Sequence, residues 1–193
     1  IGVTGVVLKY RVPRREGRAP HAAPLEDAQR AMGLIRFHAK DWGLDPHRIG
    51  VMGFSAGGHL AAAVCLGARG GPHVPAFQLL IYPATNMHMV TPSHTHNAEG
   101  YLLTRDAMTW FQQNYLASAQ DADDWRASPL LAQSHAQLPP ALVLTAGFDP
   151  LRDEGMQYAN ALSKAGVPCQ YVCFERQIHG FITMGRIMAE ANT

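Results

Sequence analysis

The sequence contains no long apolar run, and its positive and negative charges nearly cancel. A helix that crosses a membrane needs about 20 consecutive apolar residues, so we expect no membrane span. Because 16 Lys and Arg face 15 Asp and Glu, the chain has no basic field, which argues against a nucleic-acid partner. Hydrophobic residues make up 47% of the 193 positions, enough to bury the core of one domain. We expect residues 1–193 to form that single domain.

Cysteine is scarce, and the chain contains Cys65, Cys169 and Cys173. Cys169 and Cys173 fall in a predicted strand, where an extended chain separates them by about 13 Å, too far for a disulfide. An odd number of cysteines without a disulfide framework is typical of a reducing compartment. The sequence therefore predicts a cytoplasmic protein with free thiols.

Metal ligands in a recognisable spacing are also lacking. The nearest pattern is His94-x-His96, with His88 close by, which could face one side of a strand. These histidines stand in a polar stretch of Thr, Ser, Pro and Asn, without the carboxylates or thiolates that usually complete a metal site. We expect no metal ion and no other cofactor.

Short apolar segments alternate with amphipathic ones along the chain. Strands are predicted at Val3–Tyr10, Arg48–Phe54, Phe77–Tyr82, Ala141–Ala146 and Gln170–Phe174. Helices are predicted at 24–43, Gly57–Leu66, Thr104–Leu116, Leu151–Ala165 and Phe181–Glu190. This alternation is typical of an α/β fold, here a mainly parallel sheet of about five strands with helices on both faces. Residues 84–128 interrupt the alternation and are expected to form a partial cap insertion over a site.

One serine stands where a predicted strand turns into a predicted helix. The residues Gly53-Phe54-Ser55-Ala56-Gly57 match the pattern G-x-S-x-G at the strand-to-helix junction that this pattern requires. The two glycines would let the backbone turn tightly and lift the Ser55 hydroxyl above the sheet. The Ala56 N–H, at the start of the helix, would then point at developing negative charge, as in an oxyanion hole.

A serine hydroxyl is a weak nucleophile until a base accepts its proton. Asp149 follows the strand that ends in "LTAGF", and His179 follows the last strand. Together with Ser55 they lie beyond the carboxyl ends of strands, where open α/β sheets place their sites, and in the order of α/β-hydrolases. We predict the triad Ser55, Asp149 and His179. The alternative is that Asp149 only caps the helix near Leu151 and that His179 only ends a strand.

Longer motifs carry a family resemblance. The segments "LIYPAT", "AEGYLLTRDAM", "GFDPLRDEG" and "IHGF" resemble bacterial α/β-hydrolase esterases of the hormone-sensitive-lipase type, over residues 77–190 or so. The front of the chain, from "VVLKYRVPRREG" to "DPHRIGVMGFSAGGHLAA", resembles acetylxylan-esterase-like carbohydrate esterases, and Phe54 stands where lipase-type relatives usually carry an acidic residue. The resemblance assigns the triad roles to Asp149 and His179. It implies hydrolysis of short-chain acyl esters of small molecules through an acyl-enzyme, without a cofactor.

Two other functions stay open at this point. A prolyl-oligopeptidase-like serine peptidase shares the serine turn and the triad order. A catalytically weak hydrolase-fold fragment follows from a missing motif: in both resembled families an H-G-G-G-like run before the strand corresponding to Val3–Tyr10 supplies oxyanion donors, and no such run occurs here. Because the sequence also starts at Ile1, inside an apolar segment, we expect a fold abridged at its N-terminus. Assembly into a homo-oligomer is left open.

Overall fold

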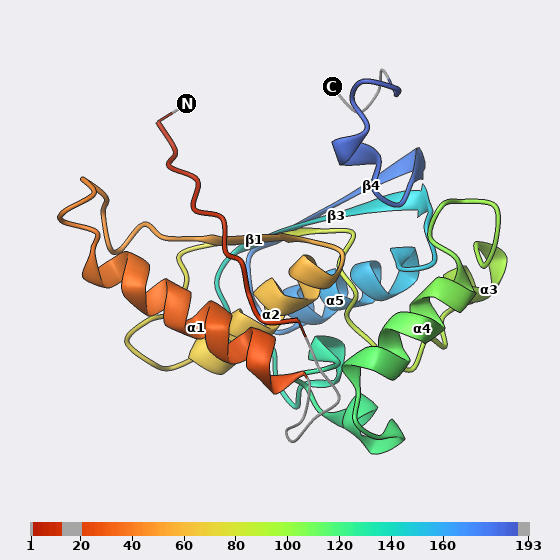
Figure 1. Cartoon of the computed structure of the whole chain (residues 1–193), viewed down its shortest axis with the longest axis horizontal. Coiled ribbons are helices and arrows are strands. Elements are labelled where there is room, and N and C mark those ends of the chain that lie inside the picture. The colour runs from red at the N-terminus through yellow and green to blue at the C-terminus, as the bar shows by residue number, and fades with distance from the viewer. Residues whose placement is uncertain (1, 13–20, 189–193) are drawn as a thin grey trace.

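Four parallel strands form one sheet in the computed structural model, which describes residues 2–12 and 21–188 (Figure 1). The strands are β1 (Val51–Phe54), β2 (Gln78–Ile81), β3 (Ala141–Phe148) and β4 (Cys169–Ile178), in the spatial order β1-β2-β3-β4. Parallel neighbours need a crossover connection between them. The long crossovers carry the helices, and the carboxyl ends of all four strands point to the same edge.

The helices are α1 (Ala22–Phe37), α2 (Ala56–Ala68), α3 (Pro92–His96), α4 (Arg105–Tyr115) and α5 (Arg152–Lys164), with the 3-10 turns η1 (Ala119–Asp123), η2 (Pro129–Leu131) and η3 (Phe181–Thr183). Four of the predicted helices form, at 24–43, Gly57–Leu66, Thr104–Leu116 and Leu151–Ala165, although the first ends already at Phe37, and α3 was not predicted. Residues 84–128, the expected insertion, fold into α3, α4 and η1. None of the helices in the described part of the chain is long and apolar enough to pass through a bilayer.

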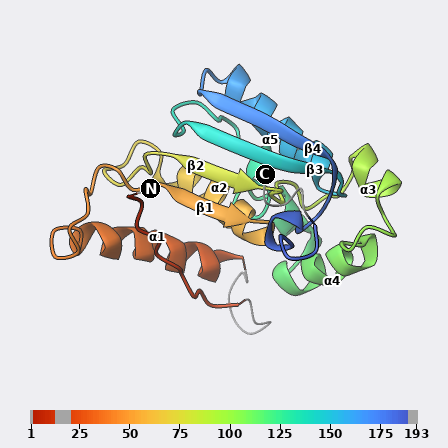
Figure 2. The ribbon, with the colours of Figure 1, turned by 90° about the horizontal axis from the view of Figure 1, so that it is seen from above.

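The main core lies between the sheet and the helices α2 and α5. Leu80 of β2 and Val143 of β3 are fully buried there against Cys65 of α2 and the α5 residues Tyr158 and Leu162. A second cluster joins α1 to α2. The helices α1, α2 and α5 therefore pack on the same side of the sheet, as Figures 1 and 2 both show.

The opposite face of the sheet is covered mainly by the chain after β4. Phe181 packs against Ile81, Tyr82 and Ala146 at the carboxyl end of the sheet. The helix expected at Phe181–Glu190 does not form as such: Phe181–Thr183 is a short 3-10 turn followed by further turns, and the last two residues of the expected helix lie outside the described residues.

The prediction of a buried strand at Val3–Tyr10 is wrong. Residues 2–12 run as an extended coil, and Val7 is 97% exposed. A strand needs a neighbour to accept and donate its backbone hydrogen bonds, and these residues lie along no described strand, since β1 pairs with β2 alone. The described sheet thus has four strands rather than five. Tyr10 nevertheless packs against the α1–α2 cluster, and the Arg11 guanidinium contacts Asp27 of α1 at 2.8 Å.

Candidate active site

Ser55 occupies the sharp turn between β1 and α2, as the motif predicts. Its backbone has φ 52° and ψ −118°, a strained conformation for a residue with a side chain. Backbone hydrogen bonds stabilise this strained conformation. The Ser55 N–H donates to the Ile81 carbonyl at 2.9 Å. The Ser55 carbonyl accepts from the His59 N–H at 3.0 Å and from the Ala84 N–H at 3.3 Å. The turn therefore fixes the Ser55 hydroxyl at the carboxyl edge of the sheet.

The structure brings the three predicted triad residues together. The Ser55 Oγ lies 3.0 Å from His179 Nε2, and His179 Nδ1 lies 2.7 Å from Asp149 Oδ2. Because a carboxylate oxygen only accepts, Nδ1 carries a hydrogen, and the neutral ring therefore leaves Nε2 as the acceptor for the Ser55 hydroxyl. Asp149 is fully buried, and its other oxygen accepts from the Leu151 N–H at 2.8 Å. The carboxylate thus both caps the turn into α5 and orients His179.

An aromatic ring supports the histidine from the side. The Tyr82 ring centroid lies 4.6 Å from that of His179, and the Phe181 ring packs on Tyr82 at 6.0 Å. Burial, together with the nearby Asp149 carboxylate, raises the pKa of Tyr82 to about 12. Its hydroxyl therefore stays neutral, and the residue acts on His179 through packing rather than charge.

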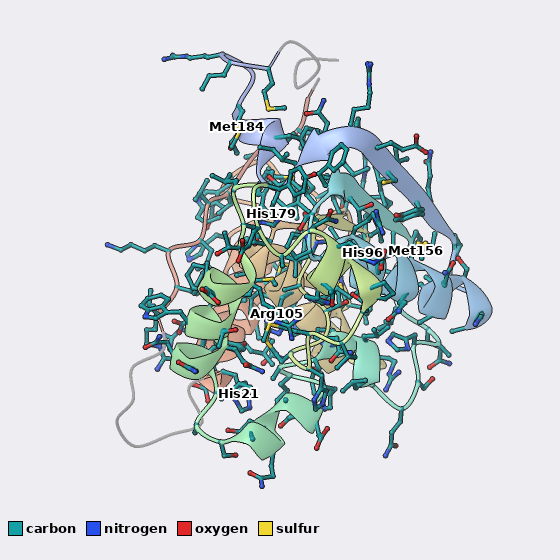
Figure 3. All side chains as sticks on the ribbon, turned by 90° about the vertical axis from the view of Figure 1, so that its right-hand side faces the viewer. His21, His96, Arg105, Met156, His179 and Met184 are labelled. Atoms are coloured by element: carbon teal, nitrogen blue, oxygen red, sulfur yellow. The ribbon has the colours of Figure 1, made fainter. Side chains whose placement is uncertain are left out.

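A cavity of about 510 Å³ opens at Ser55 and runs beneath the insertion. Most of its lining is apolar and comes from residues 84–128; it includes Met87, Met89, Leu103, Met108 and Phe111. Two methionines, Met87 and Met89, thus line the cavity, whereas Met184 lies after η3 near the C-terminal end of the described chain (Figure 3).

Ala56 is the first residue of α2 and lies at the mouth of this cavity beside Ser55. The first four N–H groups of a helix have no acceptor within the helix, and they carry its positive dipole end. The Ala56 N–H is therefore available for an anionic oxygen bonded to the carbon that Ser55 would attack.

Two of the histidines weighed as metal ligands, His88 and His94, have other partners. His94 and His96 lie on α3 rather than on a strand, and the His94 Nε2 is 3.0 Å from the Glu154 carboxylate. The His88 Nε2 is 2.9 Å from Asp123. Within residues 2–12 and 21–188, no group of three or more His, Cys, Asp or Glu is arranged to hold a metal ion.

His59, one turn after Ser55, is a buried polar residue that the sequence did not single out. It is 3% exposed, and its Nε2 lies 2.9 Å from the Arg126 carbonyl, to which it must donate. Burial lowers the pKa of His59 to about 4, with the hydrogen bond opposing this shift and His21 adding to it. The ring is thus neutral at pH 7 and lines the inner part of the cavity.

We expect His59 to make the protein sensitive to acid. The pKa of His59 is about 4 in the folded protein, against an ordinary value of 6.5. As the pH falls below 6.5, the unfolded chain therefore binds a proton at His59 before the folded protein does. The folded state loses this part of its stability as the pH falls from 6.5 towards 4. The linkage amounts to about 3 kcal/mol at most. In His59→Gln, where the amide can still donate to the Arg126 carbonyl, the free energy of unfolding measured with urea should fall less steeply between pH 6.5 and 4. Equal slopes in variant and parent would contradict this assignment.

The chain belongs to the alpha/beta hydrolase fold family, whose model matches residues 2–183. Among curated proteins it is 43% identical over 173 residues to the carboxylic ester hydrolase LipN of Mycobacterium tuberculosis, covering 86% of this chain and 46% of LipN. It is 36% identical over 193 residues to the ethyl acetate hydrolase of Pseudomonas putida, covering 99% of this chain and 60% of that protein. The chain thus spans about half of the length of these curated relatives.

Solved structures of esterases have the same fold. The thermostable carboxylesterase EstE1, cloned from a metagenomic library, superposes with a TM-score of 0.88 at 39% identity, over 95% of this chain and 62% of EstE1. An alpha/beta hydrolase from the metagenome of Lake Arreo, Spain, gives a TM-score of 0.87 at 44% identity, over 95% of this chain and 57% of that one. The expected relation to α/β-hydrolase esterases is confirmed. The particular likeness of the first third to acetylxylan esterases stays a prediction.

Proposed function

We propose that this protein is a serine carboxylic ester hydrolase that acts on short-chain acyl esters of small molecules. The observation that carries the proposal is the continuous hydrogen-bonded chain from the Ser55 hydroxyl through His179 to the buried Asp149, with Ser55 at the mouth of an apolar cavity. Names of relatives such as carboxylic ester hydrolase and ethyl acetate hydrolase support it.

The proposed reaction follows from the geometry. His179 Nε2 takes the hydroxyl proton as Ser55 Oγ attacks the ester carbonyl, and Asp149 stabilises the imidazolium that forms. The Ala56 N–H donates to the tetrahedral oxyanion. His179 then gives its proton to the departing alkoxide, which leaves an acyl group on Ser55. A water deprotonated by the same nitrogen releases the acid and restores the serine.

The cavity supports the choice of substrate. Its volume of about 510 Å³ is in the range of small-molecule sites, and we assign residues 84–128 the role of a partial cap, because α4 supplies Met108, Phe111 and Tyr115 to its lining. The inner part of the cavity is lined by His59 and Tyr115, whose rings contact each other at 5.4 Å. This wall of packed rings limits the length of a bound acyl chain.

The experiment compares labelling and turnover on the same sample. We expect a fluorophosphonate probe to label the protein at Ser55, and p-nitrophenyl butyrate to be hydrolysed faster than p-nitrophenyl palmitate. A proline peptide anilide should be left intact, and its cleavage would favour the prolyl-oligopeptidase-like reading. Labelling with little turnover of any ester would favour a catalytically weak hydrolase fold. Absence of labelling would refute the nucleophile. Cytoplasmic location stays a prediction that these assays leave aside.

A further inference from the structure

Glu154, in the first turn of α5, is a fully buried carboxylate that takes no part in the proposed reaction. Its Oε1 accepts hydrogen bonds from the backbone N–H groups of Thr85 and, at 3.1 Å, of Asn86. Its Oε2 lies 3.0 Å from His94 Nε2. Burial raises the pKa of Glu154, and these three donors oppose the shift. A buried carboxylate is tolerated only with such partners, so its presence fixes the parts of the chain that supply them.

The histidine partner belongs to α3, and its own hydrogen bonds orient it. The His94 Nδ1 accepts from the Thr91 N–H at 3.3 Å and lies 2.7 Å from the Thr91 hydroxyl. Nδ1 is therefore the bare nitrogen and Nε2 carries the hydrogen, so the 3.0 Å approach of Nε2 to the Glu154 Oε2 is a favourable electrostatic contact, although it lacks the angle of a hydrogen bond. The pair thus ties α3 to the first turn of α5, and Figure 3 shows the two helices side by side, marked by His96 and Met156.

The helix α3 and its C-cap residue Asn97 also form hydrogen bonds with the turn that carries Asp149. The Ser93 hydroxyl donates to the Pro150 carbonyl at 2.6 Å, and the Ser93 N–H donates to the Asp153 carboxylate at 2.9 Å. The Asn97 amide donates to the Asp149 carbonyl at 3.1 Å. These bonds hold the backbone on both sides of the triad carboxylate from a segment more than 50 residues earlier in the chain.

Glu154 also reaches the other end of the triad. The segment that it binds, Thr85 and Asn86, directly follows Ala84, whose N–H donates to the Ser55 carbonyl at 3.3 Å. One carboxylate therefore sits behind both the serine turn and the aspartate turn, without touching the reacting atoms.

We propose that Glu154, Ser93 and Asn97 are positioning residues that hold the Asp149 turn against His179. The proposal rests on the esterase function proposed above. If the contacts of Glu154, Ser93 and Asn97 between α3 and α5 are lost, Asp149 no longer holds His179 in one orientation. A misplacement of about 1 Å can slow a reaction about 10²-fold.

Glu154 and Asn86 also contribute to the wall of the cavity, but the Glu154 side chain is fully buried, and most of the lining comes from α4 and the methionines Met87 and Met89. Substrate binding should therefore change less than the rate of the chemical step.

The test compares Glu154→Leu, which leaves two backbone N–H groups unpaired, with Glu154→Gln, which keeps an acceptor for them. Tyr171→Phe is the matched control, because it removes a side-chain hydrogen bond of 2.8 Å between β4 and Thr145 of β3 and leaves the hydrogen bonds of Glu154, Ser93 and Asn97 in place. With p-nitrophenyl butyrate we expect kcat to fall about tenfold or more in Glu154→Leu and KM to change less than about threefold. Glu154→Gln should stay within about threefold of the parent kcat, and the control should match the parent.

A second readout does not depend on esters. The proton between Asp149 and His179 should give a low-field resonance in the NMR spectrum. We expect this resonance to shift or broaden in Glu154→Leu and to stay in place in Glu154→Gln and Tyr171→Phe. If the parent protein hydrolyses no ester but the resonance responds in this way, the proposed function fails and the positioning role stands.

Three results would overturn the proposal: an unchanged kcat and resonance in folded Glu154→Leu, a rise in KM alone, or a loss of kcat with the resonance unmoved. Should Glu154→Leu fail to fold, Ser93→Ala decides by the same criteria. It removes only the hydroxyl that bonds to the Pro150 carbonyl, the Asp153 N–H and the Thr91 hydroxyl, and we expect kcat to fall about tenfold, with the resonance displaced.

Discussion

Ser55→Ala is expected to abolish probe labelling and to lower ester turnover by at least about 10⁴-fold, while the protein stays folded. The hydroxyl is the atom that would form the acyl-enzyme, and it makes one side-chain hydrogen bond in the structure, to His179. Its loss removes chemistry and little packing. Steady-state kinetics with p-nitrophenyl butyrate measure the effect, and circular dichroism with urea unfolding checks the fold.

Two further variants serve as comparisons for Ser55→Ala: the single variant His179→Ala, and the double variant that carries both Ser55→Ala and His179→Ala. Residues that act as one unit give non-additive losses, so the double variant should be about as slow as either single one. A clear further loss in the double variant would mean that the two side chains act independently. Turnover by folded Ser55→Ala within about tenfold of the parent would assign the nucleophile elsewhere.

The meeting of Ser55, Asp149 and His179 could be predicted from the sequence because parallel strands collect their carboxyl ends at one edge of the sheet. Ser55, Asp149 and His179 each follow a strand, so the position of each is set by a short local pattern and by the direction of its strand. The side chains then need to turn only a little to meet. The helix predicted at 24–43 forms as α1 for a similar reason, since apolar residues at spacings of three and four define a buried face without reference to the rest of the fold.

The strand predicted at Val3–Tyr10 does not form, because an apolar strand pattern, unlike a helical one, depends on the presence of a neighbouring strand. Val3–Tyr10 is β-branched and apolar, but a short apolar run becomes a strand only where a neighbouring strand is available. Among the described residues β1 pairs on one side only, with β2, and residues 2–12 lie in no sheet. The pattern reports what the segment could bury and not what lies beside it.

The supporting carboxylate was beyond local reasoning. Acidic residues such as Asp153 and Glu154 at the start of a predicted helix are typical of side chains that favour its dipole, and both do stand in the first turn of α5. Yet Glu154 is buried against Thr85 and His94, which are 69 and 60 residues earlier in the chain. The local sequence around an acidic residue does not show whether its carboxylate is solvated or buried, because that depends on partners elsewhere in the chain.

The two glycines of the serine motif are expected to respond oppositely to alanine. A Cβ at Gly53 would overlap the carbonyl of Gly57 and come 2.6 Å from the Gly58 nitrogen, all of it backbone that cannot rotate away. At Gly57 a Cβ would meet no atom of the described residues within 4 Å, and its φ is not positive. Gly53→Ala should therefore lower the free energy of unfolding by about 3 kcal/mol or more and displace Ser55. Gly57→Ala should leave the free energy of unfolding within about 1 kcal/mol of the parent. Urea unfolding of both variants measures the difference, and titration with a fluorophosphonate counts the competent serines that remain. Equal destabilisation by the two substitutions would show that the turn is held by something other than the close approach of β1 to the start of α2.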